Sequence, residues 1–168
     1  MKTKESLAIE ILETPIGALR LVASARGLRR VEFANGAKPA RESGDDRANA
    51  HLARAEKQLR EYFAGQRREF TLTLDPEGDG FPQRVWQALS EIPFGETLTY
   101  GQVAARLGNR AAARAVGRAC ATNPIPVVVP CHRVLDSAGK LHGYGGGLWR
   151  KQRLLELEGA GSKIEKRK

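Results

Sequence analysis

The sequence predicts an α+β protein: a small N-terminal domain with an antiparallel sheet and a helix, then a mainly helical C-terminal domain with a helix-turn-helix. Residues 7–34 alternate apolar and polar residues in short runs between turns, whereas beyond residue 81 helical spacing dominates. The expected boundaries are 1–80 for a supporting N-terminal domain, 81–160 for the domain that carries the chemistry, and 161–168 for a basic, disordered tail.

Three short strands are predicted at the start of the chain, because β-forming residues alternate there with polar ones. They cover residues 7–13, 19–23 and 28–33. Turn residues at 15–17 and 26–27 separate them, which is typical of an antiparallel meander. Residues 36–46 are small and polar, and we expect a loop.

The apolar period lengthens between Arg47 and Ala64, which predicts an amphipathic helix ending at Gly65. Its apolar positions, at steps of four and three, are Ala48, Leu52, Ala55, Leu59 and Tyr62. Residues 69–74 alternate again and predict a fourth strand, followed by a linker at 75–80. No residue before 80 belongs to a recognisable chemical motif, so we interpret this domain as structural support.

Two short helices joined at a glycine follow in the second domain, after a helix that contains Trp86 and stops before Pro93. Thr99 can cap the first of the pair, which Gly108 ends, and Asn109 can cap the second, from Arg110 to about Cys120. This is a helix-turn-helix pattern, although helical hairpins also occur in proteins that bind no DNA.

Arginines at four-residue steps mark the second of these helices. Arg110, Arg114 and Arg118 share one face, beside the small residues Ala113 and Gly117. The packing stripe comprises Ala112, Ala115, Val116 and Ala119. Such a slim, basic helix can approach a phosphate backbone or enter a narrow groove. The alternative is a solvated charged face.

A cysteine and a histidine stand side by side in the stretch from Asn123 to Val134. Three valines between Pro126 and Pro130 cannot form a helix interior and predict a short, buried, extended segment. That segment delivers Cys131 beside His132, which is a sheltered thiol nucleophile next to a potential base. We interpret Cys120 as a small buried helix residue.

Glycines and a final helix close the domain. Gly145, Gly146 and Gly147 follow Tyr144 and let the backbone pass close to a ligand, but no Lys-Ser/Thr follows, which argues against a nucleotide P-loop. A helix is predicted over 148–157, ending at Glu158-Gly159. Its packing residues are expected to be Trp149, Leu154, Leu155 and Leu157.

Charge points to a polyanion as partner. The 168 residues include 28 basic and 19 acidic ones, so the net charge is +9, which favours nucleic acid over the alternative of a merely soluble basic surface. No signal peptide and no membrane span are apparent, so we expect a cytoplasmic protein without membrane contact. Its two cysteines should be free thiols, and no Cys/His cluster has metal-ligand spacing.

The sequence resembles the methylated-DNA–protein-cysteine methyltransferases, also called O6-alkylguanine-DNA alkyltransferases. The resemblance is carried by the residues 130–134 (Pro-Cys-His-Arg-Val), the helix pair, residues 113–117, Asn123-Pro124, the glycines after Tyr144 and the closing Glu158-Gly159. It covers roughly residues 82–159. Over residues 1–80 the match is only in length and in the order of strands and helix.

The resemblance implies one reaction, the irreversible transfer of an alkyl group from O6 of guanine in double-stranded DNA to Cys131. His132 would act as a base through a water, and Glu158 would orient it. The guanine would flip out of the duplex, Arg114 would fill the vacated space in the duplex, and the helix that carries Arg114 would lie in the minor groove. Tyr100 would help rotate the 3′ phosphate and donate a proton to the departing base.

Further residues acquire roles by the same resemblance. Val134, Tyr144 and Gly145 would form the pocket for the flipped base, and Asn123 would brace the turn that precedes Cys131. Many family members have serine at the position of Gly145; because backbone N–H groups would make that contact, the difference should matter little. Because the product is a stable thioether, the protein is expected to act once. The resemblance further implies a monomer without cofactor or metal, and O4-alkylthymine is a further candidate substrate.

Two other functions remain open on sequence grounds. A Cys-His hydrolase would use Cys131 and His132 but would not explain the arginine row. A binding module is the second alternative, either a helix-turn-helix regulator or an alkyltransferase-like protein that only marks lesions. Such lesion-marking relatives lack the acceptor cysteine, which is present here.

Overall fold

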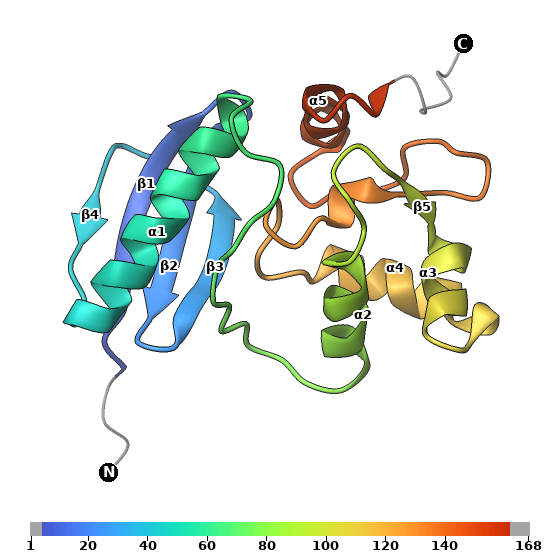
Figure 1. Ribbon diagram of the computed structural model, residues 1–168, viewed down its shortest axis with the longest axis horizontal. Coiled ribbons are helices and arrows are strands. Elements are labelled where there is room, and N and C mark those ends of the chain that lie inside the picture. Colours follow the sequence, from blue (N-terminus) through green and yellow to red (C-terminus); the bar gives the residue numbers. More distant parts are fainter. Residues whose placement is uncertain (1–4, 162–168) are drawn as a thin grey trace. The chain divides into compact units, whose positions relative to one another are not determined.

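The computed structural model describes residues 5–161, so most of the predicted basic tail, residues 162–168, lies outside the described residues. The chain divides into two compact units, Met1–Glu77 and Gly78–Lys168 (Figure 1). Within the described residues, no helix is both long and apolar enough to cross a membrane. The predicted α+β class is confirmed, with the antiparallel sheet in the first unit and most of the helices in the second.

The first unit is an antiparallel sheet covered by one helix (Figure 1). Its strand order is β3-β2-β1-β4, and the strands span Ala8–Thr14 (β1), Gly17–Ser24 (β2), Gly27–Phe33 (β3) and Arg41–Glu42 (β4). The first three strands are the predicted meander. The fourth is a two-residue strand inside the predicted loop 36–46, where it pairs with β1 at Ile9 and Glu10.

Helix α1 (Asp46–Phe63) lies where the sequence predicts a helix, and Asp45 caps it by accepting a hydrogen bond from the N–H of Ala48 (2.8 Å). The five predicted apolar positions of this helix are all buried. They pack on the sheet, whose strands β1 and β2 contact α1. The core of this unit therefore lies between one face of the sheet and one stripe of the helix.

The predicted strand at 69–74 is wrong. Only Leu74 pairs there, in an isolated bridge with Leu28. A side chain from the helix prevents the preceding residues from forming a strand. Gln58 of α1 accepts from the N–H of Thr71 (2.9 Å) and donates to its hydroxyl (3.0 Å). Because the buried Gln58 takes the N–H of Thr71, the run joins the sheet only at its end, where Leu28 donates to the carbonyl of Thr73 (2.9 Å) and accepts from the N–H of Asp75 (2.8 Å).

As far as the structure describes it, the second unit contains four α-helices together with 3-10 turns and a small sheet. The α-helices are α2 (Phe81–Leu89), α3 (Tyr100–Arg106), α4 (Ala113–Ala121) and α5 (Leu148–Leu157). Helices α2 and α4 pack together, and the indole N–H of Trp86 donates to the carbonyl of Ala119 (2.9 Å). A two-stranded parallel sheet, β5 (Leu98–Thr99) with β6 (Val134–Leu135), is an element that periodicity did not predict.

The helix-turn-helix is present, with one correction at the start of its second helix. Thr99 caps α3 in a reciprocal arrangement with Gln102. Asn109, however, caps a 3-10 turn, η1 (Arg110–Ala112), and the α-helix begins only at Ala113. In α4 the predicted packing stripe is buried at Val116 and Ala119 and only partly buried at its other two positions.

The turn between β2 and β3 gives a test of this fold. A methyl group on Gly27 would lie 2.5 Å from the carbonyl oxygen of Thr73, which is backbone and cannot move aside. We expect Gly27→Ala to lower the free energy of unfolding by about 1–3 kcal/mol. Gly65→Ala is the matched control, because Gly65 also has a positive φ but no atom within 4 Å of the added methyl. Urea denaturation of both variants would measure this, and equal losses would contradict the close packing at Gly27.

Candidate active site

Two tight turns carry the chain from α4 to Cys131. The Asn123 side chain spans the first, donating to the carbonyl of Val129 (2.8 Å) and accepting from the N–H of Ile125 (3.0 Å). Inside it, Val127 is fully buried and has a φ of 73°, a left-handed conformation that costs a non-glycine residue about 1–3 kcal/mol. The predicted burial of the valine run is therefore confirmed, and the predicted extended backbone is wrong.

The residue before the cysteine makes the second turn. Pro130 has φ −83° and ψ 64°, an inverse γ-turn, in which the N–H of Cys131 donates to the carbonyl of Val129 (2.8 Å). The chain continues as a 3-10 turn, η2 (Cys131–Arg133), and then as β6. Because β6 pairs with β5, the start of α3 lies beside the cysteine segment.

His132 and Glu158 meet in the interior of the second unit. The Nε2 atom of His132 lies 2.8 Å from Oε2 of Glu158, and both side chains are fully buried. Burial opposes ionisation of Glu158, but hydrogen bonds from His132 and Arg133 and the positive charge of Arg133 lower the pKa of its carboxyl to about 2. An ionised carboxylate accepts only, so Nε2 of His132 carries the proton and Nδ1 is the acceptor of the neutral ring.

The other ring nitrogen of His132 has a different environment. Nδ1 is buried and has no hydrogen-bond partner within residues 5–161. Burial lowers the pKa of His132, with Glu158 raising it and the cations Arg133 and Lys151 lowering it further. The imidazole is therefore held in its neutral form, with one nitrogen fixed and the other able to accept a proton.

Arg133 is a site residue that sequence reasoning missed. Its guanidinium is bidentate on Glu158, with Nε 2.8 Å from Oε1 and Nη2 2.9 Å from Oε2. A third bond joins Nη1 to the carbonyl of Ile92 (2.6 Å). The sequence signal was the arginine that follows His132, but nothing local to it identifies a partner 25 residues away.

Cys131 is buried, with 6% of its surface exposed. Burial raises the pKa of Cys131, while a hydrogen bond from Asn123 and the positive charge of Lys151 lower it. Burial also raises the pKa of Cys120, to about 12, and the negative charge that Cys131 carries as a thiolate adds to this rise. The structure thus places Cys120 within electrostatic range of Cys131, on the inner side of α4.

Lys151, on α5, is only 1% exposed and lies near the same thiols. Its Nζ donates to the carbonyls of His142 and Gly143 (3.2 Å each) and lies 5.8 Å from the ring centroid of Tyr100. Burial lowers the pKa of Lys151, and the two cysteines raise it. Sequence reasoning missed this residue because a lysine in an amphipathic helix is usually exposed.

Tyr100 begins α3 and reaches the loop that follows β6. Its hydroxyl donates to the carbonyl of His142 (2.7 Å), the same oxygen that accepts from Lys151. A methyl group on Gly117 would lie 3.9 Å from the Tyr100 ring, so α4 passes close to this tyrosine. Burial and the nearby Cys120 and Cys131 raise the pKa of Tyr100, which keeps its hydroxyl protonated.

The glycine-rich loop contains two further residues that the sequence predicts for the site, Tyr144 and Gly145. Tyr144 is largely enclosed, and burial raises its pKa, with a further rise from the charge of Cys131. Gly145 is exposed, and a side chain there would meet no atom within 4 Å. Val134, in β6, is fully buried. Helix α5 then begins at Leu148 as predicted. Of its expected packing residues, Leu154 and Leu155 are fully buried, but Trp149 (54% exposed) and Leu157 (38% exposed) do not pack inward.

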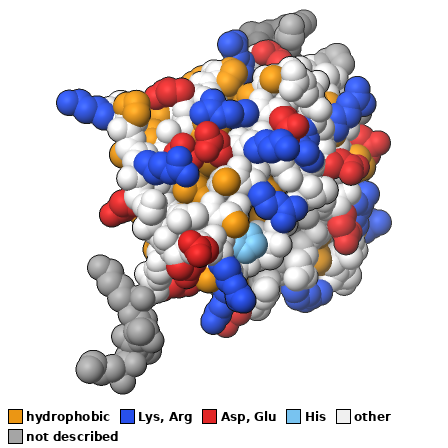
Figure 2. All heavy atoms as spheres, turned by 60° about the vertical axis from the view of Figure 1, so that its left-hand side comes forward, with side chains coloured by type: hydrophobic (Ala, Val, Ile, Leu, Met, Phe, Trp, Pro, Cys, Tyr) orange, Lys and Arg blue, Asp and Glu red, His pale blue; other side chains and the backbone are white. Residues whose placement is uncertain are grey.

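The three arginines of the predicted row are all exposed. Arg110 lies on η1, whereas Arg114 and Arg118 lie on α4, and Ala113 and Gly117 are half-buried. Basic side chains also occur elsewhere: on the face shown in Figure 2, Lys and Arg are interspersed with Asp and Glu. On that face the net positive charge is spread out instead of forming one patch.

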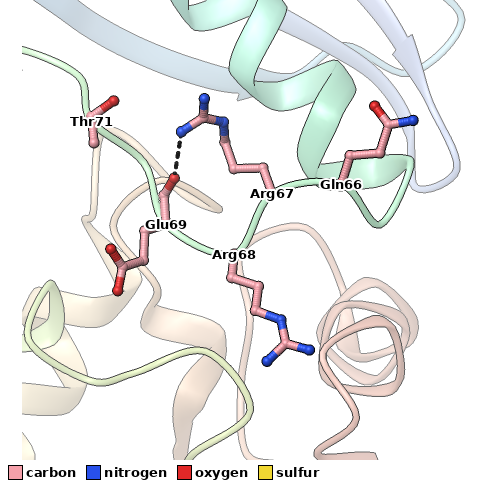
Figure 3. Close-up of a pocket in the computed structure, with 5 residues that line it drawn as sticks. All are labelled: Gln66, Arg67, Arg68, Glu69 and Thr71. Atoms are coloured by element: carbon pink, nitrogen blue, oxygen red, sulfur yellow. Dashed lines mark hydrogen bonds between the residues drawn. The ribbon is translucent and has the colours of Figure 1, made fainter.

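A shallow pocket of about 390 Å³ lies in the first unit, after the end of α1 (Figure 3). Its lining residues are Gln66, Arg67, Arg68, Glu69 and Thr71. Arg67 donates to the backbone carbonyl of Glu69 (2.9 Å) and pairs with Glu61. This pocket contains no cysteine or histidine and is therefore separate from the predicted acceptor residues Cys131 and His132. In the described part of the chain, no three His, Cys, Asp or Glu side chains are grouped to hold a metal ion.

Two family patterns match the chain. Residues 7–76 match "6-O-methylguanine DNA methyltransferase, ribonuclease-like domain", and residues 80–160 match "6-O-methylguanine DNA methyltransferase, DNA binding domain". A relative in Methanosarcina acetivorans, named methylated-DNA–protein-cysteine methyltransferase, is 47% identical over 151 residues, which cover 89% of this chain and 97% of the relative. A relative of the same name in Mycobacterium leprae is 47% identical over 88% of this chain and 89% of its own.

Solved structures agree with these matches. The O6-methylguanine methyltransferase of Mycobacterium tuberculosis superposes with a TM-score of 0.77 at 42% identity, covering 92% of this chain and 93% of the other. The structure described as M. tuberculosis OGT in complex with DNA has a TM-score of 0.78 at 44% identity and covers 92% of each chain.

The electrostatic environment of Cys131 is open to a direct test. We expect Lys151→Met to raise the pKa of the Cys131 thiol by about one unit, because it removes the buried positive charge that favours the thiolate. Lys151→Arg, which keeps the charge, is the control. Both would be made in a Cys120→Ser background, and the rate of carbamidomethylation by iodoacetamide would be followed against pH. Superimposable profiles for the Met and Arg variants would show that Lys151 does not act on the thiol through its charge.

Proposed function

The chain belongs to the 6-O-methylguanine DNA methyltransferase family, and we propose that Cys131 is the residue that receives the alkyl group from O6-alkylguanine. The protein is a DNA repair protein with methylated-DNA–protein-cysteine methyltransferase activity, and DNA is its partner. The observation that carries the assignment of Cys131 is its neighbour: a buried neutral His132, fixed on one side by Glu158 and able to accept a proton on the other.

The transfer is an in-line displacement at a saturated carbon. The proton of Cys131 passes through one water to Nδ1 of His132, while Glu158 stabilises the imidazolium that forms. The thiolate sulfur then bonds to the alkyl carbon as the bond from that carbon to O6 breaks. The guanine leaves with the electron pair of that bond and takes up one proton, for which the Tyr100 hydroxyl is the donor.

The product explains why the protein acts once. A thioether on Cys131 is stable, and hydrolysis of it would need a nucleophile aimed at the alkyl carbon, which neither His132 nor Glu158 can provide from its buried position. We therefore propose a stoichiometric acceptor that needs no cofactor or metal. O4-alkylthymine presents the same alkyl–oxygen bond and is a second candidate substrate.

Base flipping follows from the burial of the thiol. A guanine stacked in a duplex cannot reach the sulfur of a cysteine that is buried in the protein, so the base must leave the stack. We propose that α4 enters the minor groove, that Arg114 occupies the vacated space, and that Arg110 and Arg118 contact phosphates. The flipped base would lie against Val134, Tyr144 and Gly145, where the open surface at Gly145 leaves room for it.

The alternatives account for less of the site. A Cys-His hydrolase would not need three exposed arginines on the helix that leads into the acceptor segment. An alkyltransferase-like protein that only marks lesions would not need an acceptor thiol with a base beside it. The free thiols Cys120 and Cys131 favour a reducing compartment, and we propose that the protein acts as a cytoplasmic monomer.

Mass spectrometry tests the acceptor. After incubation with a duplex containing O6-methylguanine, we expect one added methyl group per protein, on the peptide that carries Cys131, and none in Cys131→Ala. Cys120→Ser is the matched control and should be methylated like the unaltered protein. Methylation of Cys120 instead, or an unmodified protein after complete mixing, would refute the assignment.

The role of Arg114 predicts a difference between two substrates. Arg114→Ala should slow transfer from duplex DNA about ten- to a hundredfold, because unstacking a base costs a few kcal/mol, and should change transfer from free O6-methylguanine little. Arg118→Ala is the control for loss of one phosphate contact, and it should mainly reduce the salt dependence of DNA binding. Equal losses on duplex and free base would contradict the intercalating role of Arg114.

A further inference from the structure

One carboxylate serves two side chains in the acceptor segment. The Oε2 atom of Glu158 lies 2.8 Å from Nε2 of His132 and 2.9 Å from Nη2 of Arg133, while Oε1 lies 2.8 Å from Nε of Arg133. The exposed fractions of His132, Arg133 and Glu158 are 0%, 6% and 4%. The proposed base is therefore not half of an isolated pair but one of three groups enclosed together.

The charges of the three groups cancel. A guanidinium and a carboxylate sum to zero, so the triad is electrically neutral only while His132 carries no extra proton. A net charge in a space that excludes water is costly. The neutral imidazole, which is the form that can accept the proton of Cys131, is thus the favoured resting form.

We propose that Arg133 is a positioning residue for alkyl transfer: its guanidinium neutralises Glu158, so that this carboxylate orients His132 without drawing a second proton onto the imidazole. The proposal rests on the proposed function, since it takes His132 to be the base. In this proposal Arg133 keeps His132 neutral while Glu158 stays ionised, which the carboxylate–histidine pair alone would not do.

The geometry shows why the arginine can hold this position. Its Nη1 atom donates to the carbonyl of Ile92 (2.6 Å), and its guanidinium carbon lies 5.9 Å from the ring centroid of Phe94. Arg133 is thereby anchored to the connection between α2 and β5, independently of Glu158. A lysine could supply the charge but not three directed bonds.

Removing the arginine changes what the remaining pair must do. Without Arg133, an ionised Glu158 beside a neutral His132 would leave one buried negative charge, and the pair would take up a proton. The proton would reside on His132 or on the carboxyl; in either case the imidazole could no longer accept another readily. Two other titratable groups interact with this triad: the charge of Lys151 lowers the pKa of His132, and the charge of Glu158 raises the pKa of Tyr144.

Histidine titration in the free protein tests the proposal. In protein labelled with 13C at histidine Cε1, Arg133→Met should move the titration of the His132–Glu158 pair to higher pH by about two units, whereas Arg133→Lys should leave it near that of the unaltered protein. His51 and His142 are internal references. The rate of a single methyl transfer at pH 7 should fall about tenfold in Arg133→Met. The acidic limb of its pH–rate profile should move by the same number of pH units as the histidine titration.

A purely structural arginine would give another result: fewer active molecules, but an unchanged titration and pH profile. Unchanged curves in folded Arg133→Met overturn the proposal, whether or not methyl transfer occurs. If that variant does not fold, Arg133→Lys and the double variant Arg133→Met/Glu158→Gln decide, because both keep the triad neutral. The proposal then requires a neutral His132 at pH 7 in each, and a protonated His132 in either overturns it. If the titrations follow the expectation but the unaltered protein is not methylated, the proposed function is refuted instead.

Discussion

The carboxylate of Glu158 is the buried charge on which the proposed acceptor site depends. It stands at the C-terminal end of α5, where the helix stops and Gly159 turns the chain with a φ of 76°. From there it holds two consecutive residues of η2, His132 and Arg133. An ionised group with this little solvent is stable only because both partners satisfy its oxygens. The end of one helix thereby sets the orientation of the segment that presents the thiol.

The parallel pairing of β5 with β6 fixes the position of Tyr100, just as Glu158 fixes the orientation of His132. Two residue pairs are enough to place the start of α3 beside the residues that follow η2. The Tyr100 hydroxyl then reaches the carbonyl of His142, which the buried Lys151 also holds. One carbonyl thus joins helices α3 and α5 to the glycine-rich loop. A site built from loops acquires its geometry through such shared acceptors.

Most regular elements follow from periodicity, and the departures have identifiable causes. The strands β1 to β3, the stripe of α1 and the bounds of α5 were predictable because each rests on neighbours within four residues. The run at 69–74 alternates like a strand, yet Gln58 occupies the hydrogen bond of Thr71. Val127 has the residue type of a strand but adopts a left-handed conformation, because Asn123 closes the turn around it. In both cases a specific side chain prevails over local propensity.

The sequence by itself determined that a cysteine and a histidine stand side by side, the caps at Thr99 and Asn109, and the spacing of the arginines, since each of these is a relation between residues close along the chain. Only the tertiary structure decided which groups act on Cys131 and His132. The pairing of Arg133 with Glu158 and the burial of Lys151 join residues from separate elements. No short-range pattern encodes such contacts, because they arise from how α5, η2 and the small parallel sheet pack together, and burial then gives each charge its effect on the pKa of its neighbours.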